Sequence, residues 1–292
     1  MAYMFKRMTF ALIALVIVVC LMTSCSQYGE DKGENMTVKQ VKGSAGLLHV
    51  NDGGTGGLPV VFVHSFAGDT THWSAQLEHL RKSRRAVAFD LRGHGQSEAP
   101  ARDDYAIESL AEDIAAVVDG LGIERFVLVG HSTGGAASLI YAGKYPTRVA
   151  GLILVGAPGK VPAEQAQQIT TMLESDYEKT MDGYFGQLLT GAKPQVVEKL
   201  TEGRRKIPRD RTVSVIKAIF QYDPLPALRS YPGQKLFVTA PPDEQPAALH
   251  NLVPEVPHRL VTDASHWLHL DKPEEFNRIL DEFLSAIKTG GK

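Results

Sequence analysis

The sequence of 292 residues lacks most of the features that would assign a protein to a class at once. It has two cysteines, no internal repeat and no low-complexity segment, and no apolar run reaches the roughly 20 residues that span a bilayer. The net charge of −2 gives no electrostatic basis for binding nucleic acid. No histidine and carboxylate group has the spacing of a metal site, and no G-x-G-x-x-G follows an apolar run. We therefore expect neither a metal nor a cofactor.

Residues 1–24 have the features of an export signal. Two basic residues precede an apolar run over residues 8–22, which suits the hydrophobic region of a signal peptide. The segment 21–25 resembles the lipobox of bacterial lipoproteins, which implies cleavage before Cys25 and acylation of its thiol. Cleavage would also remove the other cysteine, so Cys25 would have no disulfide partner. The serine after Cys25 implies, by the same resemblance, a lipoprotein of the outer membrane facing the periplasm. An uncleaved membrane anchor and a secreted protein with a free thiol remain alternatives.

The rest of the chain divides by composition into a tether and a folded body. Residues 25–36 are polar and have no apolar period, which predicts a flexible tether. The remainder is long enough for one large α/β domain with its own core. We expect residues 37–159 and 224–292 to form this core, and residues 160–223 to form a helical cap inserted into it.

Short apolar runs alternate with amphipathic stretches through most of the body. Residues 37–51 alternate and break at glycines, which predicts an antiparallel hairpin at a sheet edge. The predicted buried strands are Val60–Val63, Ala86–Phe89, Phe126–Val129, Val149–Val155, Leu236–Thr239 and Arg259–Thr262. The predicted core helices cover residues 71–80, 106–121, 133–144, a short stretch near 247–249, and 271–288. This alternation predicts a mostly parallel sheet covered by helices on both faces.

Residues 160–223 break the alternation. Short helices are predicted at 165–173, 184–189, 196–200 and 213–220, with no strand between them. The segment also carries a cluster of charges, Glu202–Lys206, which we interpret as a solvated surface rather than an anion site.

The stretch Gly130-His131-Ser132-Thr133-Gly134 follows a buried strand and precedes a run of small residues. A residue at such a sharp strand-to-helix turn has a strained backbone, and the flanking segments pass so close that glycines are needed two residues before and after it. The hydroxyl of Ser132 would stand clear of the sheet, near the amide of Thr133 and the positive end of the helix. The pattern predicts a nucleophilic serine.

A serine hydroxyl needs a base to take its proton, and the base needs an acceptor that fixes its tautomer. His266 lies between the last predicted strand and the last helix, and Asp243 directly follows the preceding strand. The chain order Ser132, Asp243, His266 fits a catalytic triad in which strand ends carry the groups. Glu244 is an alternative acid.

With these residues in place, the chain resembles the capped α/β-hydrolases, a family of esterases, lactonases and perhydrolases. The resemblance covers roughly residues 45–288 and rests on His64–Gly68, Asp90–Ser97, Gly130–Gly135 and Ser265–Trp267. It implies an α/β-hydrolase fold with a mostly parallel eight-stranded sheet, and oxyanion donors at the backbone amides of Phe66 and Thr133. Family members usually have His-Gly where this chain has His64-Ser65, and a glycine three residues before the acid where this chain has Ala240.

The remaining histidines and tryptophans have plainer interpretations. By the family pattern His269 lies past the catalytic loop, and we expect a structural role. His64, His94 and His131 flank the site and are expected to pack or to form hydrogen bonds. Trp73 and Trp267 are expected to be core or pocket wall.

These observations predict a serine hydrolase that cleaves a small carboxylic ester or lactone through an acyl-enzyme. At the strand-to-helix turn of Gly130–Gly134, which we call the elbow, the chain has serine rather than aspartate. This argues against a dehalogenase or epoxide hydrolase. Serine enzymes that form peracids, cleave C–C bonds or cleave amides remain alternatives. The alternative from another class is a lipid-anchored binding or sensor protein that keeps the fold with little turnover.

Overall fold

The computed structural model describes residues 37–287. The predicted signal peptide (residues 1–24), the tether (25–36) with Cys25, and Lys288 at the end of the last predicted helix lie outside the described residues. In the part that the structure describes, no helix has both the length and the apolar character needed to cross a membrane.

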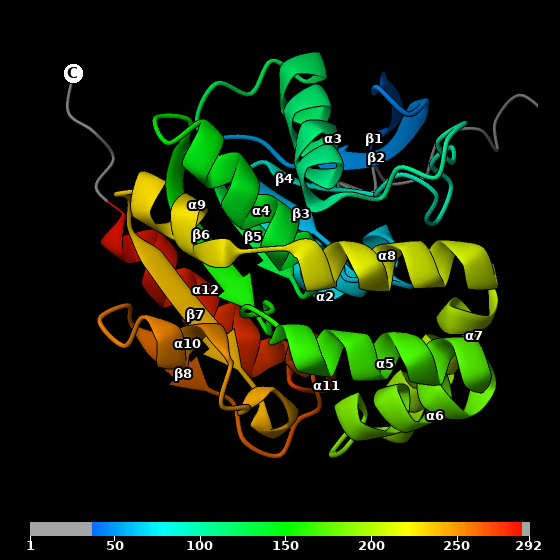
Figure 1. The fold of residues 1–292 in the computed structure, drawn as a ribbon. Coiled ribbons are helices and arrows are strands. Elements are labelled where there is room, and N and C mark those ends of the chain that lie inside the picture. Colours follow the sequence, from blue (N-terminus) through cyan, green and yellow to red (C-terminus); the bar gives the residue numbers. More distant parts are fainter. Residues whose placement is uncertain (1–36, 288–292) are drawn as a thin grey trace, which may run out of the picture. The chain divides into compact units, whose positions relative to one another are not determined.

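Eight strands form one sheet in the order β1-β2-β4-β3-β5-β6-β7-β8 (Figure 1). They are β1 (Thr37–Lys42), β2 (Leu47–Gly53), β3 (Val60–Val63), β4 (Ala86–Phe89), β5 (Phe126–His131), β6 (Val149–Val155), β7 (Lys235–Thr239) and β8 (His258–Leu260). β1 and β2 form an antiparallel hairpin at the edge, β2 pairs antiparallel with β4, and the other neighbours are parallel. The predicted α/β sheet, mostly parallel and eight-stranded, is confirmed.

The central strands are apolar at consecutive positions because both faces of the sheet are covered. In β3, Val60 and Phe62 belong to one hydrophobic layer, and Val61 and Val63 belong to the other. The layer around Val61 is covered by α3 (Ile107–Gly120), α4 (Thr133–Lys144) and α9 (Pro224–Ser230); the opposite layer is covered by α2 (Ser74–Arg81) and α12 (Pro273–Ala286) (Figure 1). The carboxyl ends of the parallel strands are the edge at which such folds place their sites.

Four helices between β6 and α9 pack together beside the sheet (Figure 1). They are α5 (Ala163–Ser175), α6 (Tyr177–Leu188), α7 (Pro194–Arg205) and α8 (Arg209–Gln221). Their apolar side chains share a hydrophobic cluster with Phe66, Ala67 and Trp267 of the core. The cap therefore covers the loops that carry the predicted oxyanion donor and the predicted base.

All four of these helices are longer than predicted, and the start of the helix is shifted most in α6, which begins at Tyr177 instead of Tyr184. Two glycines in this stretch weaken the helical signal. Burial of Met181 and Phe185 against the other cap helices supplies the stability that the local sequence lacks.

The segment before the last helix also differs from prediction. The helix expected to begin at Asp271 begins at Pro273, and Asp271 instead ends a short helix, α11 (Leu268–Asp271). The carboxylate of Asp271 accepts hydrogen bonds from the amides of Ser265 and Lys193, so it serves two distant loops rather than the helix start. The remaining short elements are η1 (Thr70–Trp73), η2 (Pro241–Asp243) and α10 (Leu249–Leu252).

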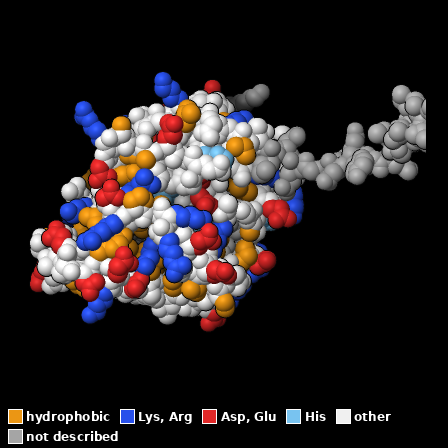
Figure 2. All heavy atoms as spheres, turned by 90° about the vertical axis from the view of Figure 1, so that its right-hand side faces the viewer, with side chains coloured by type: hydrophobic (Ala, Val, Ile, Leu, Met, Phe, Trp, Pro, Cys, Tyr) orange, Lys and Arg blue, Asp and Glu red, His pale blue; other side chains and the backbone are white. Residues whose placement is uncertain are grey.

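The charge cluster at the end of α7 is paired within the cap. Arg204 contacts Asp182 of α6 at 2.5 Å and lies 5.4 Å from the ring centre of Phe185, and Lys206 pairs with Glu202 at 2.8 Å. Figure 2 shows basic and acidic side chains interspersed over the cap side of the molecule. These contacts support the interpretation of the cluster as a solvated surface.

Candidate active site

Ser132 lies between the end of β5 and the start of α4, with backbone angles φ 52° and ψ −119°. A positive φ is uncommon for a residue with a side chain and marks local strain. Two hydrogen bonds hold the turn: the amide of Ser132 donates to the carbonyl of Val155 at 2.8 Å, and its carbonyl accepts from Ala136 at 3.0 Å. The structure thus forms the sharp strand-to-helix corner that the sequence predicts.

The two glycines around Ser132 are required by close approach. A Cβ atom on Gly130 would lie 2.5 Å from the carbonyl oxygen of Gly134, and one on Gly134 would lie 2.3 Å from the carbonyl oxygen of His64. Any side chain at either position would therefore push the helix away from β5 or from the loop after β3. These contacts also bring the loop of Phe66 next to the first turn of α4.

Asp243 and His266 form a direct pair. The His266 Nδ1 atom lies 2.5 Å from Asp243 Oδ1, and both side chains are buried, with 6% and 7% of their surface exposed. The second oxygen of Asp243 accepts a hydrogen bond from the amide of Ala240 at 2.9 Å, which fixes the carboxylate. Because a carboxylate can only accept, Nδ1 is the donor of this bond, and in the neutral imidazole the lone pair then lies on Nε2.

A glycine that the sequence interpretation missed makes room for this pair. Gly156 directly follows β6 and has φ +49°, and a Cβ atom there would lie 2.8 Å from His266 Cε1 and 3.2 Å from Asp243 Oδ2. The signal in the sequence is a glycine directly after a buried strand, at the edge where the triad residues were expected.

The predicted oxyanion donors, Phe66 and Thr133, lie on adjacent segments. Thr133 is the first residue of α4, and Phe66 lies in a turn in which the amide of Gly68 donates to Ser65 at 3.0 Å and Ala67 has φ 58°. Within residues 37–287, neither the Phe66 nor the Thr133 amide donates a hydrogen bond to a protein acceptor. Free amides beside the elbow are what an oxyanion requires.

Ser65, which replaces the usual glycine, links the loop of Phe66 to the loop of His266. The indole N–H of Trp267 donates to Ser65 Oγ at 3.2 Å, and Ser65 Oγ donates to the carbonyl of Phe66 at 3.2 Å. The oxyanion loop is therefore tied to the residue that follows His266.

Glu244, the alternative acid, is engaged elsewhere. Its carboxylate accepts a hydrogen bond from the hydroxyl of Thr239 at 2.7 Å, and its other oxygen lies 3.1 Å from His250 Nε2. Asp243 is the carboxylate that contacts His266, so the geometry favours Asp243 as the acid.

The flanking histidines are buried and neutral. His64 donates from Nδ1 to the carbonyl of Ser65 and accepts at Nε2 from the amide of Leu91, and burial lowers its pKa to about 4. Burial and the nearby His266 hold the pKa of His131 well below its usual value, and its Nε2 donates to the carbonyl of His266. His269 stacks on Trp73 with ring centres 4.2 Å apart. These contacts give each of the three histidines a packing or hydrogen-bonding role.

The cap closes directly over these loops. The carbonyl of Leu188 at the end of α6 accepts a hydrogen bond from the amide of His266 at 3.0 Å. Phe185 of the same helix stacks on Trp267, and a Cβ atom on Gly203 of α7 would lie 2.6 Å from the carbonyl oxygen of Ala67. The cap thus touches both the predicted base loop and the predicted oxyanion loop.

Comparison with known proteins supports the fold assignment. Residues 59–191 match the family model described as the alpha/beta hydrolase fold. With the sheet order and the sharp turn at Ser132, this match shows that the chain has the α/β-hydrolase fold.

Two curated proteins and one solved structure illustrate what this chain is similar to. The chain is 30% identical over 249 residues to the dihydrolipoyllysine-residue acetyltransferase component of the acetoin cleaving system of Pseudomonas putida, covering 80% of this chain but only 65% of that protein. It is 28% identical over 264 residues to epoxide hydrolase 3 of Xenopus tropicalis, covering 77% and 71%. The structure of a thermophilic esterase from Thermogutta terrifontis, 25% identical, has a TM-score of 0.72 and covers 87% of this chain and 100% of that one.

Proposed function

We propose that the protein is a serine hydrolase that cleaves a small carboxylic ester or lactone. The observation that carries the proposal is the buried contact of 2.5 Å between Asp243 and His266, together with Ser132 in a strained corner. Nε2 of His266 takes the hydroxyl proton while Ser132 Oγ attacks the carbonyl carbon, and the amides of Phe66 and Thr133 stabilise the oxyanion.

The remaining steps return the site to its starting state. Collapse of the tetrahedral intermediate transfers the His266 proton to the leaving alcohol and leaves an acyl group on Ser132. His266 then takes a proton from water, the resulting hydroxide attacks the acyl carbon, and the acid departs as Ser132 regains its proton. In a lactone the leaving alcohol and the acid remain one molecule.

The residue at the elbow favours an ester over an epoxide. Attack of a serine hydroxyl on an epoxide would form an ether, which water does not cleave under these conditions, whereas attack on an ester forms an acyl-enzyme that water hydrolyses. The likeness to an esterase from Thermogutta terrifontis supports the same choice. The rings of Phe66 and Trp267 pack against Phe185 of the cap, which supports a small substrate.

The test is hydrolysis of p-nitrophenyl acetate by the parent and by Ser132→Ala. We expect kcat to fall by about 10⁶-fold, to the background rate, because the nucleophile is lost. Ser285→Ala on the exposed face of α12 is the control and should keep parental activity. A fluorophosphonate should label the parent at Ser132 and leave Ser132→Ala unlabelled.

Two results would contradict the proposal. Parental turnover by Ser132→Ala would remove Ser132 as the nucleophile. Tight binding of a small ester by the parent, without turnover and without fluorophosphonate labelling, would instead favour the binding or sensor protein.

We also propose that residues 1–24 are removed, that Cys25 carries the lipid, and that the protein is anchored to the outer membrane. The lipobox-like segment before Cys25 supports this proposal. Radiolabelled palmitate should enter the parent and Cys20→Ala, because Cys20 lies in the removed peptide, and should not enter Cys25→Ala. Label that persists in Cys25→Ala would refute acylation at this position, and fractionation of the labelled cells identifies the membrane.

A further inference from the structure

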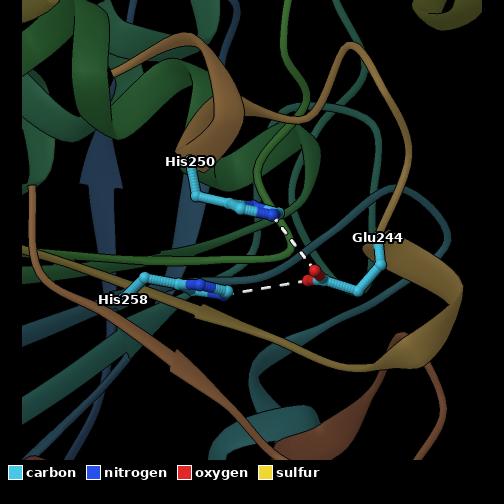
Figure 3. Close-up of side chains that lie close together, drawn as sticks. All are labelled: Glu244, His250 and His258. Carbon is cyan, nitrogen blue, oxygen red and sulfur yellow. Dashed lines mark ion pairs between the residues drawn. The ribbon is translucent and has the colours of Figure 1, made fainter. Parts of the chain in front are cut away.

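Three side chains that the proposed reaction does not use converge beside the triad. Glu244 follows Asp243 in the turn after β7, His250 lies in α10, and His258 is the first residue of β8. Figure 3 shows both imidazoles pointing at the carboxylate of Glu244. In the sequence these residues lack the regular spacing of a metal motif, and the connection between β7 and β8 brings them together.

The distances within this cluster suit a shared cation better than a set of hydrogen bonds. The Nε2 atoms of His250 and His258 lie 3.1 and 3.7 Å from the oxygens of Glu244, and all three potential ligand atoms lie within 4.8 Å of one another. Zinc bonds of 2.0–2.1 Å in a tetrahedron place neighbouring ligand atoms about 3.4 Å apart. The separation of 3.7 Å is too long for a hydrogen bond but close to that spacing.

The surroundings already orient the ligands. The rings of His250 and His258 are stacked, with centres 4.1 Å apart and an angle of 14° between their planes, which points both Nε2 atoms the same way. The hydroxyl of Thr239 donates to Glu244 Oε1 at 2.7 Å and accepts from His258 Nε2 at 2.6 Å, so His258 gives up its Nε2 proton and this hydrogen bond when it binds an ion. A hydrogen bond from an outer group to a ligating carboxylate is a regular feature of metal sites.

We propose that Glu244, His250 and His258 bind a divalent transition-metal ion of the Zn²⁺ class. Two imidazole nitrogens and one carboxylate oxygen suit zinc, whereas Mg²⁺ and Ca²⁺ prefer oxygen ligands. The exposed fractions of the three side chains are 9% for His250, 26% for His258 and 35% for Glu244, so an ion reaches the site from solvent and a water completes its coordination.

The position of the site gives the ion a structural role that does not depend on the proposed hydrolysis. Glu244 lies near the start of the connection from β7 to β8, and His258 lies at its end. An ion bound to both Glu244 and His258 would link the two ends of this connection. Asp243 lies in its first turn. A small cavity lined by Thr239, Asp243 and His250 separates the two sites.

The test is zinc binding by the full chain in detergent, after treatment with EDTA and alkylation of both cysteines. Titration calorimetry should show one saturable Zn²⁺ site, and Co²⁺ at the same site should give the visible absorption of a four-coordinate ion. Because loss of an outer support weakens metal binding by about 10–100-fold, loss of a ligand in His250→Asn or His258→Asn should weaken Zn²⁺ binding by about 100-fold or more.

A second histidine and carboxylate pair supplies the matched control. His79 contacts both oxygens of Asp281 at 2.9 and 3.0 Å, so His79→Asn removes a similar surface pair that has two members instead of three. Zn²⁺ should raise the melting temperature of the parent and of His79→Asn, and should not raise that of His250→Asn or His258→Asn.

Two outcomes would overturn the proposal: no saturable Zn²⁺ binding by the parent, or parental affinity in both ligand variants. Should a histidine variant fail to fold, Glu244→Gln keeps the shape of the side chain and removes the charged ligand. Parental Zn²⁺ affinity in Glu244→Gln would overturn the proposal equally.

Discussion

Replacement of Gly156 by alanine should damage the proposed triad without touching any of its members. The new Cβ atom would lie 2.8 Å from His266 Cε1, so the imidazole must move by about 0.6 Å to reach the ordinary contact distance of 3.4 Å. Since a displacement of about 1 Å at a reacting group costs about 100-fold in rate, we expect kcat/KM for p-nitrophenyl acetate to fall by about 10- to 100-fold. The left-handed φ of +49° should also cost about 1–2 kcal/mol of stability.

Gly122→Ala separates these two effects. Gly122 follows α3 with φ +63°, and a Cβ atom there would meet nothing within 4 Å. Urea unfolding should therefore show a similar loss of about 1–2 kcal/mol in this variant, while kcat/KM stays at the parental value. Equal kcat/KM in the two variants would refute the argument that Gly156 makes room for the pair of Asp243 and His266.

Three further predictions concern the acid, pH and a buried ion pair. Asp243→Asn should lower kcat by about 10⁴-fold, whereas Glu244→Gln should lower it far less, and equal losses would contradict the assignment of the acid. His64 has a folded pKa of about 4, so the unfolded chain binds a proton below pH 6.5 that the folded protein does not. The His64 contribution should therefore lower the free energy of unfolding by about 2 kcal/mol from pH 7 to pH 5, measured with urea, and His64→Gln should lose less over the same interval. Asp113→Ala should cost about 3 kcal/mol because the buried guanidinium of Arg92 loses its buried partner at 2.7 Å and keeps the half-exposed carboxylate of Asp104 at 3.1 Å; a loss below about 1 kcal/mol in urea unfolding would contradict this.

The sequence predicts the core of the fold well because its signals are local. Each parallel strand is a short apolar run, and five consecutive residues are enough to predict the elbow at Ser132. The cap is harder to predict, since Met181 and Phe185 hold α6 only through contacts with other helices. The predicted start of the last helix was wrong because the carboxylate of Asp271 accepts hydrogen bonds from the amides of Ser265 and Lys193. No local sequence pattern reveals these contacts.

The same distinction applies to the candidate site. The pairing of Asp243 with His266 was anticipated from chain order and strand ends, which the fold type dictates. The roles of Gly156 and of Ser65 were not anticipated, because each depends on which loops become neighbours in space. The grouping of Glu244 with His250 has the same origin, since it forms only when the connection after β7 folds back on itself.

The hydrogen bond from His266 to Leu188 limits how the cap can be exchanged. The last carbonyls of a helix have no partner within the helix, and at the end of α6 one of them receives its donor from the amide of His266. A cap taken from another protein of this fold would have to place a carbonyl at the same point, or the loop of His266 would lose this hydrogen bond. Re-engineering of substrate preference should therefore alter side chains on the inner faces of the cap helices rather than replace residues 160–223.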